Sequence, residues 1–436
     1  MKRRILLFLL TISITTTSFF SKEKRSIPTC IVENSAETWG FFSHKLINRC
    51  AVFTLPEEML PLFKPNIEYI TEQAIAPDKR RFIVANEGFR HYINLDRWAF
   101  LPQDKLEAQI LHTDILLVGE RGDTTLLVDY QSIRKAKRDY YLKAKAIKKL
   151  FGRDSVIVSD STFRRFFIHN LSRIQPDENM SISMDSLTKF FKKEGLILRG
   201  PFRAAFAKDK LTATGILPFH LITLQRQLME AFVAKDKNRI LKLAAEMGHY
   251  IADAHVPLHT ISNYDGQQTN QNGIHAFWES RLPELFAKSQ YDFFAGRAEY
   301  FDSPKKYYWN IIAESSKLVA KTLRVEKEVA AAFRDDNKYC PETVNRTTLK
   351  KPCFDFAQSY HEQLGGMVED RMRDAILAVG SAWLTAWTDA GKPDLENFKI
   401  IGPLSKTDSI KVDSTELAGD KVLKNGGKMI GRHEEY

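Results

Sequence analysis

The hydrophobic positions of this chain recur with the period of an α-helix over most of its length. Leu46, Ile47 and Cys50 begin this pattern, and the segments around Phe219 and Lys306 continue it. A Pro-ended helix is expected from Asn238 to the residues before Pro257. The pattern therefore predicts a mostly α fold. Its expected helices cover about 44–53, 57–74, 219–233, 238–256, 306–333 and 359–389.

The pattern changes between about residues 103 and 200, which we interpret as an insertion. Two apolar runs, Asp114–Glu120 and Thr124–Tyr130, flank the turn sequence Arg121-Gly122-Asp123, and this arrangement predicts a small β-hairpin. The run from Ile133 to Lys149 is strongly basic, with lysines all round a helical projection. We expect a solvated helix there, with a site for acidic partners as the alternative.

The two ends of the chain differ from its centre. Met1-Lys2-Arg3-Arg4 precedes the short apolar run Ile5–Ile12, which predicts a signal peptide over 1–21, followed by a leader-like segment over 22–38. We therefore expect export to the periplasm or the extracellular space. No other stretch is apolar enough to predict a transmembrane span. Residues 396–436, rich in Lys, Asp and Gly, predict a mobile tail.

Composition and charge narrow the function classes. The chain is 44% hydrophobic and 27% charged, which is typical of a globular protein. The formal charge of +10 favours phosphate-bearing substrates, nucleic acid or anionic lipid, although dispersed lysines also serve solubility. Cys340 and Cys353 flank a Pro-bearing loop and are able to pair in an oxidising compartment, whereas Cys50 is expected to be buried.

The most informative stretch holds five potential metal ligands. His249 and Asp253 are one helical turn apart and project from one face, and His275 and Glu279 repeat this spacing on a helix expected to close at 281–283. His259 lies between the two pairs. Mixed nitrogen and oxygen donors suit Zn²⁺ better than Mg²⁺ or Ca²⁺. The alternative is a pair of ordinary surface or core polar contacts.

Three residues upstream extend this set of candidate ligands. His44 lies near the start of the first predicted helix, and Asp78 and His91 follow in the next segments. Taken singly, Asp78 is also interpretable as a helix N-cap and His91 as a packed core histidine.

The order of these residues resembles that of the zinc-dependent phospholipase C / S1–P1 nuclease superfamily. The pattern is Trp39 and His44 five residues apart, then Asp78, His91, His249-x3-Asp253-x5-His259 and His275-x3-Glu279. The resemblance covers about 39–101 and 203–394. It implies one compact multi-helix phospholipase C/P1 nuclease-like domain over 39–395, interrupted by the insertion at about 103–200.

The resemblance also implies three zinc ions. The first would be held by Asp78, His91, His249 and Asp253, the second by His259, His275 and Glu279, and the third by Trp39, His44 and Asp253. In that superfamily the tryptophan is the mature N-terminus and binds through its backbone. Because Trp39 here follows a leader, we expect proteolytic trimming to expose it; the alternatives are a third zinc bound without the amine and the absence of that zinc.

The implied activity is hydrolysis of phosphodiesters by a metal-activated water, with Asp78 and Asp253 as catalytic residues. Glu279 matches the phospholipase C branch, where the nuclease branch has Asp, so phospholipid is the first expected substrate. The alternative is an S1/P1-type single-strand endonuclease and 3′-nucleotidase, with Phe277 and Trp278 either stacking on bases or packing in the core.

A third hypothesis is a secreted helical binding protein with a degenerate metal site. Peripheral membrane contact is compatible with the lipid substrate, and the sequence leaves the oligomeric state open.

Overall fold

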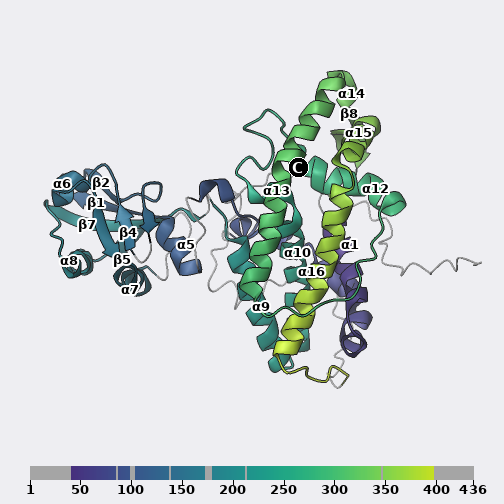
Figure 1. The fold of residues 1–436 in the computed structure, drawn as a ribbon, viewed down its shortest axis with the longest axis horizontal. Helices are drawn as coiled ribbons and strands as arrows, with labels where there is room; N and C mark the ends of the chain where they lie inside the picture. Colours follow the sequence, from purple (N-terminus) through teal and green to yellow (C-terminus); the bar gives the residue numbers. More distant parts are fainter. Residues whose placement is uncertain are drawn as a thin grey trace, which may run out of the picture.

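The computed structural model describes residues 41–84, 87–98, 104–136, 139–171, 179–211, 214–344 and 347–396. Over these residues the chain is mostly helical with a few small antiparallel sheets, as the hydrophobic pattern predicts. Figure 1 shows a body of long helices and a smaller lobe of strands and short helices that projects from it. The signal peptide, the leader, Trp39 and nearly all of the predicted tail lie outside the described residues.

The central helices of the body lie beside one another (Figure 1). They are α1 (Phe41–Ala51), α9 (Leu217–Val233), α10 (Lys237–His255), α13 (Pro304–Ala332) and α16 (Met367–Asp389). Other helices connect or cover them: α2 (Leu60–Phe63), α3 (Ile67–Gln73), α4 (Ala76–Arg80), α11 (Ile274–Ala276), α12 (Leu282–Gln290), α14 (Asp335–Lys338) and α15 (Phe354–Leu364).

Helix α10 lies at the centre of the body and contacts α1, α3, α9, α13 and α16. Buried polar side chains join these helices across the apolar core. The indole of Trp383 donates to the carbonyl of Ala244 at 3.0 Å, which ties α16 to α10. Gln225 of α9 donates to the carbonyl of Ala382 at 3.0 Å and accepts a bond from the hydroxyl of Tyr308 at 2.5 Å. Such bonds fix the rotation of each helix, because a turned helix would leave a buried polar group unsatisfied.

Two predicted helix boundaries are wrong. The predicted helix over 359–389 is two helices, α15 and α16, that break at Gly365 and Gly366, whose φ angles are 62° and 79°. Left-handed backbone ends a helix, and glycine adopts it without steric cost. The helix expected to close at 281–283 instead continues to Gln290, because Pro283 occupies the first turn of α12, where its missing N–H is harmless.

The lobe is an α+β unit that is larger than the predicted hairpin. Its sheets are antiparallel, in the orders β2-β1-β7-β6 and β3-β4-β5. The predicted hairpin is present, with Leu117 opposite Thr125. The lobe continues to Asp209, beyond the expected end near 200. Its elements are α5 (Lys105–Leu111), β1 (Thr113–Gly119), β2 (Thr124–Val128), β3 (Arg134–Ala136), β4 (Asp139–Leu142), α6 (Ile147–Phe151), β5 (Val156–Ser159), α7 (Asp160–Asn170), β6 (Asn179–Ile182), α8 (Met184–Lys193) and β7 (Phe202–Asp209).

The helix predicted for the basic run 133–149 is wrong. This run forms β3, β4 and the short helix α6. Tyr140 and Leu142 alternate with more exposed neighbours along β4 and are buried against β5, so a two-residue period carries the burial. Most of the lysines in this run lie outside the strands, and their density hides the two-residue period in the sequence.

His112 lies where the lobe joins the body and provides a pH-dependent contribution to stability. Its ring is buried 4.1 Å from that of Trp98 and its Nδ1 lies 3.2 Å from the carbonyl of Ala108. Burial lowers the pKa of His112 to about 4, against 6.5 for an unperturbed histidine. The unfolded chain therefore takes up this proton first. The resulting stability is fully present above about pH 6.5 and is lost as the pH falls towards about 4.

We expect His112→Phe, which keeps the ring but cannot be protonated, to reduce this acid sensitivity. Between pH 7.5 and 4.5 the wild type should lose about 2 kcal/mol of unfolding free energy more than the variant. Urea unfolding of both proteins across that range measures the difference. Parallel pH profiles would contradict the assignment.

No helix within the described ranges is long and apolar enough to cross a membrane.

Candidate metal centre

Helix α10 places two candidate ligands deep in the body. Its N-terminus is capped by the side chain of Asp236, which accepts a bond from the backbone N–H of Arg239 at 3.1 Å. His249 and Asp253 follow one turn apart near its other end, and both are almost completely buried. The Nε2 atom of His249 lies 3.4 Å from Oδ2 of Asp253, so the predicted shared face is present.

His44 reaches this pair from the start of α1. Its imidazole stacks on that of His249 with ring centroids 4.0 Å apart, and its Nε2 lies 3.5 Å from Oδ1 of Asp253 and 3.2 Å from Oε1 of Glu279. The Ser43 hydroxyl donates to the carbonyl of Glu279 at 2.9 Å, although the two residues are 236 positions apart. This bond joins the first helix to the last ligand segment.

Asp78 and His91 approach from the opposite side, on α4 and just after the 3-10 turn η4 (Gly88–Arg90). The Nδ1 atom of His91 lies 2.9 Å from Oδ2 of Asp253 and 3.0 Å from Nε2 of His249. Oδ1 of Asp78 lies 3.6 Å from the same His249 nitrogen. The next residues are held by backbone bonds, since the Ile93 N–H donates to the carbonyl of His259 at 2.9 Å. Asp78 lies inside α4, whose N-cap is Ile75, so the N-cap alternative is wrong, whereas the burial of His91 also fits a core histidine.

The remaining ligands follow α10 directly. Val256–Pro257 ends that helix, and the 3-10 turn η7 (Pro257–Thr260) carries His259. The Nδ1 atom of His259 bonds the carbonyl of His91 at 2.6 Å, which turns its Nε2 towards Glu279 at 3.3 Å. His275 Nε2 lies 2.8 Å from the same Glu279 carboxylate. Glu279 belongs to η8 (Phe277–Arg281), a π-helical segment, and such segments are frequent at functional sites.

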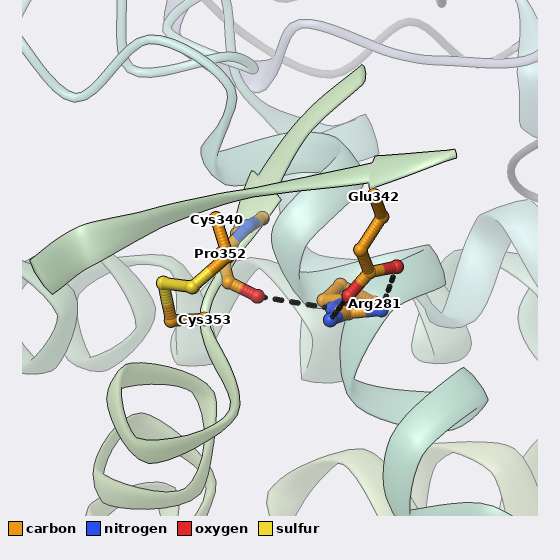
Figure 2. Close-up of a disulfide and its surroundings, with 5 residues drawn as sticks. All are labelled: Arg281, Cys340, Glu342, Pro352 and Cys353. Atoms are coloured by element: carbon orange, nitrogen blue, oxygen red, sulfur yellow. Dashed lines mark hydrogen bonds and ion pairs between the residues drawn. A yellow bond between two sulfur atoms is a disulfide. The ribbon is translucent and has the colours of Figure 1, made fainter. Parts of the chain in front are cut away.

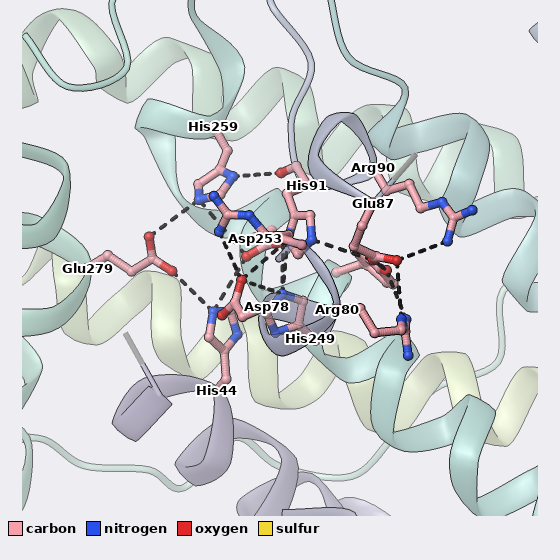
Figure 3. A network of polar contacts seen from close by, with 12 residues as sticks. His44, Asp78, Arg80, Glu87, Arg90, His91, His249, Asp253, His259 and Glu279 are labelled. Atoms are coloured by element: carbon pink, nitrogen blue, oxygen red, sulfur yellow. Dashed lines mark hydrogen bonds and ion pairs between the residues drawn. The ribbon is translucent and has the colours of Figure 1, made fainter. Parts of the chain in front are cut away.

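Asp253 is the residue common to these contacts (Figure 3). Its Oδ2 faces His91 and His249, whereas its Oδ1 faces His44 at 3.5 Å and His259 at 3.9 Å. One carboxylate thus serves two sets of imidazoles from opposite sides. A carboxylate in this position is able to bridge two cations.

Three groups of described residues are able to hold a metal ion, and the ligand atoms of each group lie within 4.8 Å of one another. The groups are His44, His249 and Asp253; Asp78, His91 and His249; and His259, His275 and Glu279. All their members are buried, which distinguishes these groups from the acidic clusters common on protein surfaces. The Nδ1 atoms of His44 and His249 are buried without a hydrogen-bond partner, and their Nε2 atoms point at carboxylates. The donor set therefore fits divalent cations.

The electrostatics of the centre reflect a high density of buried charge. Burial opposes protonation of His44, but its bond to Glu279 and the charges of Asp253, Glu279 and Asp78 raise its pKa to about 9. Burial, reinforced by the neighbouring His44, lowers the pKa of His249 well below its usual value. A neutral imidazole is the form that binds a cation, so His249 is already in its ligand state near neutral pH.

The aromatic residues next to the centre are in the core. Phe277 and Trp278 are buried, and the ring of Phe277 packs 5.1 Å from Phe356 and 4.9 Å from Tyr360. Their burial matches the core-packing alternative and leaves neither ring open to a base. Two further histidines pack nearby: the ring of His220 lies 4.5 Å from that of Tyr250, and Nδ1 of His255 lies 2.7 Å from the carbonyl of Ile251.

Sequence reasoning missed the charged residues around the ligands. Arg81 lies one turn after Asp78, with Nη1 3.1 Å from Oδ1 of that carboxylate. Glu87, Arg80 and Arg90 form a buried cluster beside His91 (Figure 3). The spacing of Glu87 and His91 repeats the four-residue interval of the ligand pairs, and this was the signal available in the sequence.

Arg281 connects the π-helical segment to a stapled hairpin (Figure 2). The hairpin consists of β8 (Tyr339–Val344) and β9 (Thr347–Pro352), and the structure contains the Cys340–Cys353 disulfide that the sequence suggested. The buried Arg281 donates to the carbonyl of Pro352 and to the carboxylate of Glu342, both at 3.1 Å. Because Arg281 is two residues after Glu279, the hairpin restrains that ligand.

Replacing both cysteines with serine is expected to destabilise the protein by about 2–3 kcal/mol, because the unfolded chain regains the entropy of a short loop. The expected second effect is weaker metal binding at the group that contains Glu279. Calorimetry and metal titration measure the two effects. Thr348→Ala, on the exposed side of the same hairpin, is the control and should change neither. A double variant with unchanged metal affinity would show that the hairpin does not restrain Glu279.

Comparisons with known proteins add no relative. A scan against protein-family models found no match, and a search of curated proteins found no similar sequence.

Proposed function

We propose that this chain is an exported, zinc-dependent phosphodiesterase with phospholipase C-like activity. The observation that carries the proposal is the convergence of the eight described ligand candidates on one buried centre around Asp253. A structural metal site would need a single closed set of four ligands. Several groups of ligands placed around one carboxylate, as here around Asp253, are instead typical of hydrolytic sites with several metals.

Zinc is the ion that the donor chemistry favours. The centre combines five imidazoles with three carboxylates, and Mg²⁺ and Ca²⁺ prefer all-oxygen ligands. Asp78, His91, His249 and Asp253 would hold one zinc, and His259, His275 and Glu279 a second. His44 and Asp253 would hold a third together with Trp39, which lies outside the described residues.

Bound zinc ions would lower the pKa of a water molecule and offset the negative charge of a phosphodiester. The chain supplies the positioning. Asp253 fixes the spacing of the groups on its two sides, and Asp78 closes the group nearest Arg81. The guanidinium of Arg81 lies at this edge of the centre, where it is able to contact a phosphate oxygen.

An activity assay distinguishes the two candidate substrate classes, phospholipid and single-stranded nucleic acid. Glu279 matches the residue of the phospholipase C branch and so favours a phospholipid substrate, whereas an S1/P1-type enzyme would cleave single-stranded nucleic acid. We expect purified, zinc-loaded protein to release a phosphorylated headgroup from phosphatidylcholine vesicles and to leave a single-stranded oligonucleotide and a 3′-nucleotide intact. The reverse pattern would identify a nuclease. Inactivity of zinc-replete protein on all these substrates would reject the phosphodiesterase proposal.

The same preparation tests the binding-protein hypothesis and the role of the leader. Metal analysis should find about three zinc ions per chain if the resemblance holds, and protein without zinc would favour a degenerate site. N-terminal sequencing of active protein from the native host should begin at Trp39. Active material that retains upstream residues would show that the tryptophan amine is not a ligand.

A further inference from the structure

Glu87 is a buried carboxylate that belongs to none of the ligand groups. It has no exposed surface. Arg80 donates to its Oε2 from Nε at 3.2 Å, Arg90 donates to Oε2 from Nη1 at 3.1 Å, and the hydroxyl of Tyr250 donates to Oε1. The two guanidinium groups and the hydroxyl all donate to this carboxylate, and such contacts favour its ionised form.

The Oε1 atom of Glu87 also faces the ligand ring of His91. It lies 3.6 Å from Nε2, on the side of the ring away from the centre. The opposite nitrogen, Nδ1, points at Asp253, His249 and Asp78 over 2.9, 3.0 and 3.7 Å. The Nε2 atom of His91 therefore faces an anion at ion-pair distance and has no hydrogen-bond partner among the described residues, while Nδ1 points into the candidate metal group.

A neutral imidazole carries one proton, and only the nitrogen without it is able to bind a cation. A carboxylate next to one ring nitrogen keeps the proton there and frees the other. We propose that Glu87 is a positioning residue that holds the proton of His91 on Nε2 and so presents Nδ1 as the ligand atom. This inference rests on the metal centre of the proposed function. It assigns a role to a residue that is not itself one of the candidate ligands.

The surrounding contacts show why the carboxylate is held so firmly. Arg80 spans Glu87 and Glu246, with its Nη1 2.5 Å and its Nη2 3.2 Å from the two Glu246 oxygens. Glu246 and Tyr250 are one turn apart on α10, beside the row that carries His249 and Asp253. Glu87 is thus fastened to the helix that supplies the other ligands. Its contacts fix the position of His91 relative to that helix as well as the tautomer.

An ion cluster with a purely structural role would have different consequences, and Glu246 provides the matched control. It shares Arg80 with Glu87 and is equally buried, but its described contacts run to Arg80 and not to His91. Glu87→Gln and Glu246→Gln each remove one charge from the same cluster at constant side-chain size. If the cluster only stabilises the fold, both variants should lose similar stability and bind metal alike.

We expect Glu87→Gln to weaken the binding of one zinc equivalent about 10–100-fold and Glu246→Gln to weaken it by less than about threefold. Full-length proteins are equilibrated with buffered free zinc, and bound metal is counted by mass spectrometry, with urea unfolding recorded in parallel. The equivalent bound by His259, His275 and Glu279 should be unaffected in both variants. Equal zinc affinities for the two variants would overturn the proposal.

A second measurement uses the wild-type protein, so it does not depend on whether a variant folds. Long-range ¹H–¹⁵N correlation spectra of the metal-free wild type, with ¹⁵N-labelled histidine, should show His91 with its proton on Nε2. A proton on Nδ1 would overturn the proposal outright. Neither measurement uses phosphodiester turnover. A protein that binds zinc but cleaves no phosphodiester would therefore reject the proposed activity and leave the role of Glu87 standing.

Discussion

Replacing Asp253 by asparagine is expected to leave about one of three zinc ions bound and to lower phosphodiesterase turnover on the order of 10³-fold or more. The two oxygens of Asp253 face separate sets of imidazoles, His91 and His249 on one side and His44 and His259 on the other. An amide keeps one weak oxygen donor and replaces the other with an N–H group, which repels a cation. The two proposed zinc sites that share Asp253 should therefore lose their metals together.

The group formed by His259, His275 and Glu279 has its own carboxylate, so it should retain its ion. Metal analysis after dialysis, combined with steady-state kinetics, measures both effects. Asp185→Asn, an equivalent change on the exposed first turn of α8, controls for the loss of one surface charge and should behave as the wild type. Full zinc content or near-normal turnover in Asp253→Asn would show that this carboxylate is not a bridge.

Gly248→Ala is expected to destabilise the protein by about 3–5 kcal/mol, although the same substitution usually stabilises a helix by about 1 kcal/mol. A Cβ at this position of α10 would lie 1.8 Å from Oδ1 of Asn48. Asn48 is fully buried and donates to the carbonyls of Ile70 and Ala245 at 3.3 and 2.9 Å. It cannot move aside without leaving its own buried amide group unsatisfied, so α1 would have to shift away from α10.

Urea unfolding of Gly248→Ala, Asn48→Ala and the double variant tests this account as a double-mutant cycle. The double variant should be more stable than the sum of the single effects predicts, because removal of the Asn48 amide makes room for the methyl group. Additive effects would mean that Asn48 is not the obstacle. Since His249 is the next residue, zinc affinity should fall in Gly248→Ala and recover in part in the double variant.

The helical body was predictable because its signal is local. Amphipathic stripes such as that from Phe219 to Val233 have one period, and the four-residue spacing of His249 and Asp253 fixes a shared face wherever the helix packs. The chain contacts that bring His44 and Asp78 to Asp253 are not local. Their grouping could be anticipated only from a resemblance in residue order, and the described geometry is consistent with it.

The features that were missed depend on tertiary contacts. Residues 134–136 and 139–142 form strands, and Tyr140 and Leu142 pair with residues of β5 more than ten positions away. Without that partner, the lysine-rich sequence resembles a solvated helix. The π-helical segment ends at Arg281, so Pro283 lies in the first turn of α12, where proline does not end a helix. The four-residue spacing of Glu87 and His91 was visible, but the contacts of Glu87 with Arg80 of α4 and Tyr250 of α10 join separate segments, which no spacing rule connects.

The bond between Ser43 and Glu279 has a consequence for biosynthesis, because it spans 236 positions with the entire α+β lobe in between. During translation the contact of α1 with Glu279 cannot form until more than half of the chain has emerged from the ribosome. Contacts of such long range slow folding, because the intervening chain must be confined before they form. The lobe, whose contacts are largely its own, is therefore expected to reach its native fold first, and the halves of the body that flank it to close around the ligands last.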